Sequence, residues 1–197
     1  MLLEQGGLGH TFPIVCQERE FIDNILNTTP IDDLVQSFTS EDGVDSERDK
    51  VLGGTSTISV GFYSREDVAY IQGSGWEEAL VNQSYQWVED SVVFRPALRR
   101  WQITFMNALR RAGANPYNGY TLDHIGGTKI GGTTFDGRGL RHSSADLLEH
   151  ANCNKLRIAT RAMVSQILFN RIDKEQGRSK DLSLYILIEI DRRTSRN

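Results

Sequence analysis

The stretch with the clearest capacity for chemistry holds two adjacent glycines followed by hydroxyl side chains, and it reads Val51-Leu52-Gly53-Gly54-Thr55-Ser56-Thr57-Ile58-Ser59. Adjacent glycines let a backbone approach a ligand without a Cβ in the way. Thr55 and Ser56 can cap a helix that begins here, and the first N–H groups of such a helix point toward an anion. The stretch therefore fits a phosphate-binding turn, although an ordinary loop uses the same turn residues.

A second candidate lies near the start of the chain, where Met1-Leu2-Leu3 is followed by Glu4 and then by Gly6-Gly7. This pattern indicates the end of a buried strand, an acidic residue and a glycine turn. In dinucleotide-binding folds an acidic residue after the second strand bonds the ribose hydroxyls, about 20 residues beyond a G-x-G-x-x-G turn. The alternative is a solvated charge that ends a strand.

Length and composition bound the remaining possibilities. The 197 residues can form one large domain or two small ones, and 39% hydrophobic and 24% charged residues are ordinary for a globular protein. A net charge of −4 gives no reason to expect nucleic acid or an anionic membrane as a partner. Cys16 and Cys153 have no metal-ligand spacing, so we expect no metal site, and nothing supports a disulfide between them. No stretch reaches the roughly 18 apolar residues of a membrane span.

Helical periodicity appears in two stretches. Residues 76–93 place apolar side chains at i, i+4, i+7 and i+11, namely Val81, Tyr85, Val88 and Val92. Residues 99–112 predict a second helix, which Gly113 ends. Its apolar face carries Trp101, Phe105, Ala108, Leu109 and Ala112, and we expect this face to be core. The arginines at the two ends of this helix are expected to be solvated.

The other stretches predict strands and turns. Residues 8–50 look polar and irregular, with an acidic turn at 40–43. Residues 126–141 predict short strands with glycine turns, and Asp136-Gly137 is a hairpin signal. A short helix is expected from about Ser143 to Asn152, with His142 beside it in a structural role. Strands are expected at 156–160, 164–169 and in the apolar run after 181.

Four ordered blocks of the sequence resemble the plant branch of the glucose-methanol-choline (GMC) FAD-dependent oxidoreductases. They read DKVLGGTSTISVGFYSR, WEEALVNQSYQWVED, LDHIGGTKIGGTTFDGRGLRHSSADLLEHAN and LRIATRAMVSQILF. The first is similar to the flavin-diphosphate signature of that family, and the branch contains HOTHEAD-like proteins and (R)-mandelonitrile lyases. The resemblance runs from about Met1 to Phe169.

The resemblance implies an α/β fold, in which a partial FAD-binding Rossmann-like domain is joined to part of an α+β substrate domain. It implies FAD as the cofactor, with Glu4 at the ribose and the backbone of Val164 at the adenine, where a core-strand valine is the alternative. Ser59 stands where the family usually has asparagine. Matching the motif residue by residue assigns the diphosphate and flavin contacts to Val51, Gly53, Gly54, Thr55, Ser59, Val60, Gly61 and Phe62.

The same resemblance sets expectations for organisation and activity. Residues 1–169 would be the N-terminal FAD-binding region, beginning after the first strand and its G-x-G-x-x-G turn, and 170–197 a divergent tail. The four histidines match none of the family's catalytic positions, so no catalytic residue is assigned, and we expect the chain alone neither to retain FAD stoichiometrically nor to turn over.

Three functions stay open: part of an alcohol oxidoreductase acting on CH–OH groups, part of a hydroxynitrile lyase, or a non-catalytic remnant. The expected partner is a small-molecule alcohol or cyanohydrin. Plant relatives are often secreted, but the first residues lack the basic and apolar regions of a signal peptide, so the localisation stays open.

Overall fold

The computed structural model describes residues 1–20, 34–170 and 183–190, and contacts divide the chain into two units. The first unit comprises Met1–Leu8, Pro30–Leu52 and Ala151–Asn197, and the second comprises Gly9–Thr29 and Gly53–His150. Both are mixed α/β or β structures, which agrees with the predicted fold class. Among the described residues, no helix has the length and apolar character needed to cross a membrane.

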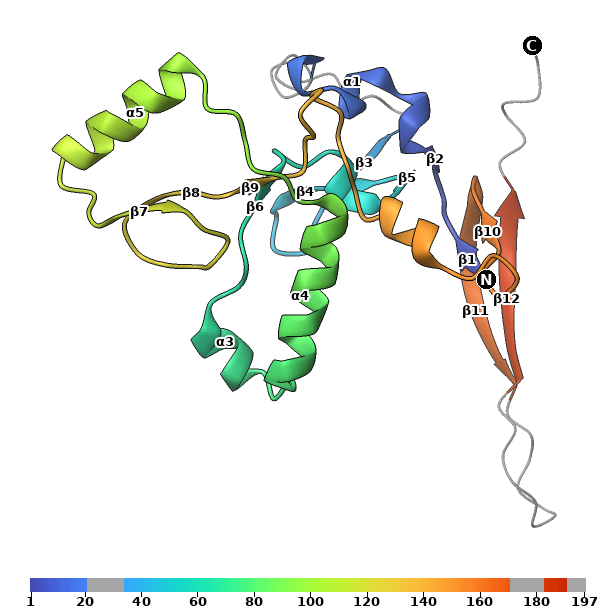
Figure 1. Ribbon diagram of the computed structural model, residues 1–197. Helices are drawn as coiled ribbons and strands as arrows, with labels where there is room; N and C mark the ends of the chain where they lie inside the picture. Colours follow the sequence, from blue (N-terminus) through green and yellow to red (C-terminus); the bar gives the residue numbers. More distant parts are fainter. Residues whose placement is uncertain (21–33, 171–182, 191–197) are drawn as a thin grey trace. The chain divides into compact units, whose positions relative to one another are not determined.

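The first unit is built from paired strands (Figure 1). The first eight residues of the chain form two short parallel strand pairs, β1 (Leu2–Leu3) with β10 (Ile158–Ala159) and β2 (Gly7–Leu8) with β5 (Val51–Leu52). Two antiparallel pairs complete the unit, β3 (Val35–Thr39) with β4 (Asp45–Asp49) and β11 (Ala162–Asn170) with β12 (Ser183–Ile190). The strands expected after residues 156, 164 and 181 are therefore confirmed.

The prediction that residues 8–50 are irregular is wrong for residues 35–49, which form the β3–β4 hairpin. These strands are mostly exposed and carry polar residues on both faces, so they lack the apolar alternation that marks a half-buried strand. The acidic turn between them is confirmed: Gly43 has a φ of 82°, and the Gly43 N–H donates to the Ser40 carbonyl over 2.9 Å.

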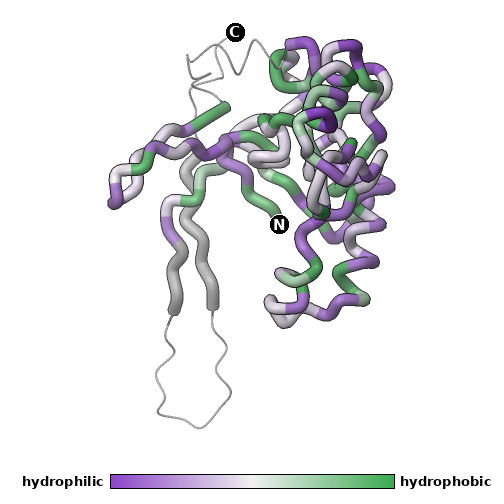
Figure 2. The backbone as a smooth tube through the Cα atoms, turned by 90° about the vertical axis from the view of Figure 1, so that its left-hand side faces the viewer, coloured by the Kyte–Doolittle hydropathy of each residue, from purple (hydrophilic) through white to green (hydrophobic). Residues whose placement is uncertain are grey.

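The second unit carries the helices. These are α1 (Pro13–Cys16), α3 (Val68–Gly73), α4 (Glu78–Val92) and α5 (Arg100–Arg111), with short 3-10 helices η1 (Gly9–Thr11), η2 (Gly54–Thr57) and η3 (Asp146–His150). Two strand pairs connect them, β6 (Phe62–Tyr63) antiparallel to β9 (Gly132–Thr133) and β7 (Tyr117–Tyr120) parallel to β8 (Thr128–Ile130). Hydrophobic and hydrophilic residues are interspersed along the coloured part of the backbone (Figure 2).

The α4 prediction is confirmed in extent and in face. Its four periodic residues are all half-buried or buried, with Val92 only 6% exposed. A polar cluster anchors the same helix, because two nitrogens of the Arg65 guanidinium, Nε and Nη2, each donate to the Glu89 carboxylate over 2.7 Å. Tyr63 donates its hydroxyl to the same carboxylate over 3.1 Å, and burial together with Glu89 raises the pKa of Tyr63.

The extent of α5 is also confirmed, but the prediction that its aromatic face is core is wrong. Trp101 is 66% exposed and Phe105 is 59% exposed, and no residue of the helix is buried. The described residues bring no apolar surface over that face. The helix ends as predicted: Gly113 has a φ of 91°, and the Ala114 N–H donates to the Leu109 carbonyl over 3.0 Å, a Schellman motif.

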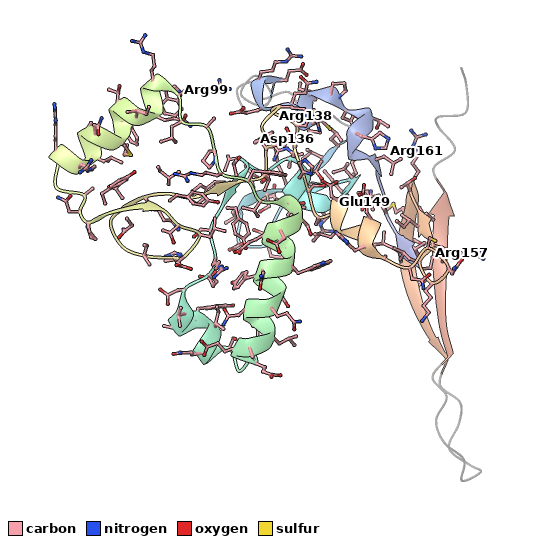
Figure 3. The ribbon with its side chains drawn as sticks, in the orientation of Figure 1. Arg99, Asp136, Arg138, Glu149, Arg157 and Arg161 are labelled. Atoms are coloured by element: carbon pink, nitrogen blue, oxygen red, sulfur yellow. The ribbon has the colours of Figure 1, made fainter. Side chains whose placement is uncertain are left out.

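The glycine-rich segment after residue 126 forms the expected short strands and hairpin. Phe135 and Arg141 bridge the two sides, and the Asp136 carboxylate accepts from the Arg138 N–H and the Leu140 N–H over 2.8 and 2.9 Å. Figure 3 shows Asp136 and Arg138 together at this turn. The left-handed residue is Gly139, with a φ of 77°, rather than Gly137.

Candidate cofactor site

The turn at Gly53 and Gly54 requires glycine at both positions. Gly53 has a φ of 105° and Gly54 a φ of 55°, conformations that residues with a Cβ rarely adopt. A Cβ on Gly53 would lie 2.6 Å from the Thr57 hydroxyl and 2.8 Å from the Ser143 hydroxyl, whereas a Cβ on Gly54 would meet nothing within 4 Å. Gly53 is therefore packed inside the second unit, while Gly54 faces open space.

The prediction of a helix after this turn is wrong in type, because the structure has a single 3-10 turn, η2, at this place. Neither Thr55 nor Ser56 caps it; Gly53 is the N-cap, and no side chain accepts a cap hydrogen bond. The Ser56 hydroxyl instead donates to the Gly53 carbonyl over 2.7 Å. The Ser59 N–H bonds the Thr55 carbonyl over 2.9 Å, and left-handed Gly61 then turns the chain away.

A segment about 90 residues away in sequence holds the same turn. The Ser144 hydroxyl donates to the Gly53 carbonyl over 2.7 Å, and the Ser144 N–H donates to the Ser56 hydroxyl oxygen over 2.9 Å. Ser143 is buried against Gly53, and its own N–H donates to the Asp146 carboxylate over 3.3 Å. The residues expected only to begin a short helix thus also contact the glycine turn.

Arg141 supports the turn from its buried side. Its Nε donates to the Val15 carbonyl over 2.7 Å, and its Nη1 lies 3.3 Å from the Ser59 hydroxyl oxygen. The guanidinium carbon lies 4.3 Å from the centre of the Phe135 ring, a cation–π distance. Burial lowers the pKa of Arg141 to about 10. The same ring packs against Gly61, where a Cβ would collide with it.

The remaining predicted contacts of the second unit are on its surface. Thr55 is exposed, Val60 is 67% exposed and Phe62 is 61% exposed. Together with Gly53, Gly54, Ser59 and Gly61, these three residues are the predicted contacts within residues 53–62. Backbone N–H groups, hydroxyls and apolar side chains in this stretch are the groups that a diphosphate and a flavin ring need.

The other three predicted residues belong to the first unit. Glu4 follows β1 as expected, and its carboxylate accepts from the Gly6 N–H over 2.7 Å. Val51 is fully buried in β5, so its side chain is a core group. Val164 is 40% exposed beside the register shift of β11, so the core-strand interpretation of this valine is wrong. Residues 163–166 are all exposed, so neither face of β11 is buried at this point.

His142 lies beside the first residue of η3, and the structural role expected of it stays a prediction. Its Nδ1 lies 2.9 Å from the Asp146 carboxylate, and its ring lies 4.8 Å from that of Phe94. Cys16 and Cys153 are free thiols. Sequence reasoning missed Arg141 and Ser144 as partners of the glycine turn; the only signal was their place inside the third matching block.

No protein-family model matches the chain. It is 48% identical over 170 residues to an (R)-mandelonitrile lyase-like protein of Arabidopsis thaliana, which covers 85% of this chain and 31% of that protein. Protein HOTHEAD of the same plant is 44% identical, covering 86% and 28%. Sinalpyl alcohol oxidase Nec3 of Nesocodon mauritianus is 41% identical, covering 86% and 31%. The chain thus spans about a third of the length of these relatives.

Solved structures show the same fold. Pyridoxine 4-oxidase from Mesorbium loti matches 93% of this chain and 40% of its own, with a TM-score of 0.62 at 19% identity. Formate oxidase from Aspergillus oryzae RIB40 matches 85% and 35%, with a TM-score of 0.58 at 14% identity. The relatives and the shared fold show that this chain belongs to the GMC oxidoreductase family, in its (R)-mandelonitrile lyase-like and HOTHEAD-like branch.

Proposed function

We propose that residues 1–169 are the FAD-binding region of a GMC-type oxidoreductase that acts on CH–OH groups of a small-molecule donor, and that 170–197 are a divergent tail. The observation that carries the proposal is the turn at Gly53 and Gly54, which is packed on one side and open on the other. Its conformation, its neutral donors and its place in the matching family block all suit a diphosphate.

Each predicted residue receives a role within this proposal. The N–H groups of Gly53 and Gly54 and the Thr55 hydroxyl would bind the diphosphate. Ser59 to Phe62 would line the flavin, Glu4 would accept from the ribose, and the backbones of Val51 and Val164 would approach the dinucleotide and the adenine. One oxygen of Glu4 already accepts from Gly6, which leaves the other for the ribose. Bound FAD would supply the hydride-accepting group.

A hydroxynitrile lyase is the second candidate, because several relatives bear the name (R)-mandelonitrile lyase. Both candidates need the same cofactor contacts. They differ in the substrate: a small alcohol in the first case and a cyanohydrin in the second.

The first test is to titrate the purified chain with FAD and, separately, with riboflavin, following flavin fluorescence. Binding of FAD without binding of riboflavin supports a site for the diphosphate. Failure of the chain to bind FAD at all, or equal affinity for both flavins, contradicts the proposal. Because the chain alone is not expected to turn over, the substrate is tested in a full-length relative that carries this turn. Anaerobic bleaching of flavin absorbance by an aromatic alcohol supports the oxidoreductase, and cyanide release from mandelonitrile supports the lyase.

A further inference from the structure

Ser144 makes a distinct pair of contacts with the glycine turn. Through its hydroxyl it donates to the Gly53 carbonyl over 2.7 Å, and through its N–H it donates to the Ser56 hydroxyl oxygen over 2.9 Å. The two serine hydroxyl oxygens also lie 3.1 Å apart. Because the Ser56 hydroxyl also donates to the Gly53 carbonyl over 2.7 Å, two donors converge on that oxygen.

The Gly53 carbonyl determines where the next N–H points. A trans peptide is planar, with its C=O and N–H on opposite sides, and Gly53–Gly54 is not among the cis peptide bonds. Two hydroxyl donors that hold the Gly53 carbonyl therefore point the Gly54 N–H in the opposite direction. A Cβ on Gly54 would meet nothing within 4 Å, so this glycine has open space beside its Cα.

The turn needs such a constraint because its two glycines have more backbone freedom than any other residue. The turn has local bonds of its own, the 3-10 bonds of η2 and those from the Ile58 and Ser59 N–H groups to the Thr55 carbonyl, and Ser144 adds a contact from a distant segment. The segment that carries Ser144 is itself fixed, since Arg141 donates to the Val15 carbonyl and the Ser143 N–H donates to Asp146.

We propose that Ser144 is a positioning residue for the cofactor: by holding the Gly53 carbonyl it aims the Gly54 N–H at the diphosphate. This role rests on the proposed FAD-binding function. Ser144 itself does not touch the cofactor in this account, and it acts through the planar peptide between the two glycines.

The experiment compares Ser144→Ala and Ser144→Thr with the matched control Ser84→Ala in the full chain. Ser84 is also exposed and also loses one hydroxyl-to-carbonyl bond, 2.8 Å to Leu80, but it lies in α4. Two quantities are measured: amide hydrogen exchange of residues 53–59 without ligand, and the FAD dissociation constant. Removing one neutral hydrogen bond that orders the turn is expected to change each by about five- to tenfold.

Ser144→Ala is expected to speed exchange across residues 53–59 and to weaken FAD binding, while Ser144→Thr restores both and Ser84→Ala changes neither. The urea midpoint of unfolding should be similar for Ser144→Ala and Ser84→Ala. If Ser144 had only a structural role, Ser144→Ala would lower this midpoint together with FAD affinity. Wild-type FAD affinity and exchange in Ser144→Ala would overturn the positioning role, as would a Ser144→Ala chain that does not fold. Absence of FAD binding by the wild-type chain would overturn the proposed function instead.

Discussion

Two of the chain's glycine turns, the one after β1 and the one at Gly53, are stabilised in different ways. The turn after β1 combines a local bond with distant backbone partners: the Glu4 carboxylate accepts from the Gly6 N–H, and the Gly6 carbonyl accepts from the Arg161 N–H over 2.8 Å. Gly6 is also buried against the Lys50 backbone. The turn at Gly53 depends on a distant segment, because Ser144 and Arg141 hold its carbonyl and hydroxyl groups. The distant partners of the first turn are backbone groups, whereas those of the second turn include side chains.

Gly6→Ala should have the largest effect on stability. The new Cβ would overlap the backbone carbonyl of Lys50, which has no flexible end that can move aside. We expect a loss of about 3 kcal/mol in the free energy of unfolding, measured by circular dichroism in urea. Gly126→Ala is the matched control, because its Cβ would meet nothing within 4 Å. Equal midpoints for the two variants would contradict the close packing of Gly6.

The two glycines of the second turn should differ from each other. Gly53→Ala places a Cβ against two hydroxyls in a left-handed conformation, and we expect it to cost about 2 kcal/mol of stability. Gly54→Ala carries only the left-handed penalty, about 1 kcal/mol. Urea unfolding followed by tryptophan fluorescence measures both. A larger loss for Gly54→Ala would mean that Gly54, rather than Gly53, is the packed residue.

Glu4→Ala should affect the first turn without disturbing the second. Losing a carboxylate acceptor for the Gly6 N–H should cost about 1.5 kcal/mol, the scale of a hydrogen bond to a charged group. FAD affinity should fall as well if the remaining carboxylate oxygen binds the ribose. Hydrogen exchange of residues 53–59 should stay at the wild-type rate, and faster exchange there would show that the two turns are coupled.

The smallest effect expected is a difference in thiol reactivity. Burial raises the pKa of Cys16, whose thiol donates to the Gly9 carbonyl over 3.1 Å, whereas Cys153 is exposed. A raised pKa means less thiolate at pH 8, so iodoacetamide should alkylate Cys16 more slowly than Cys153. Peptide mass spectrometry over time gives the two rates. Because Arg141 bonds the Cys16 carbonyl, fast alkylation of Cys16 would indicate that the support behind the second turn opens readily.

Sequence patterns predicted the elements well where residues close in sequence determine them. The 3.6-residue period of α4, the glycine after α5 and the turn near Asp136 are set by neighbours in sequence, and all three are confirmed. The exposed face of α5 was not predictable, because apolar spacing reports what a helix can bury and not whether a partner covers it.

The candidate site was predictable only in part, for the same reason. The Gly53–Gly54 turn has a recognisable sequence, and its left-handed backbone follows from the glycines. The hydroxyl pair of Ser56 and Ser144 comes from segments 88 residues apart, and no local rule joins them. The 3-10 turn in place of a helix was not predicted either: Ser56 lies inside this turn, and its hydroxyl bonds the Gly53 carbonyl instead of capping a helix.

The most direct test of the FAD assignment is hydrogen exchange of the Gly53–Ser59 amides with and without FAD, in the wild-type chain and in Gly54→Val. Exchange across α5, which is outside the proposed site, serves as the internal reference. FAD should slow exchange at Gly54 to Ser56 in the wild-type chain and leave it unchanged in Gly54→Val, because the branched side chain would fill the open space beside Gly54. FAD that binds both chains with equal affinity and protects neither turn would contradict this assignment.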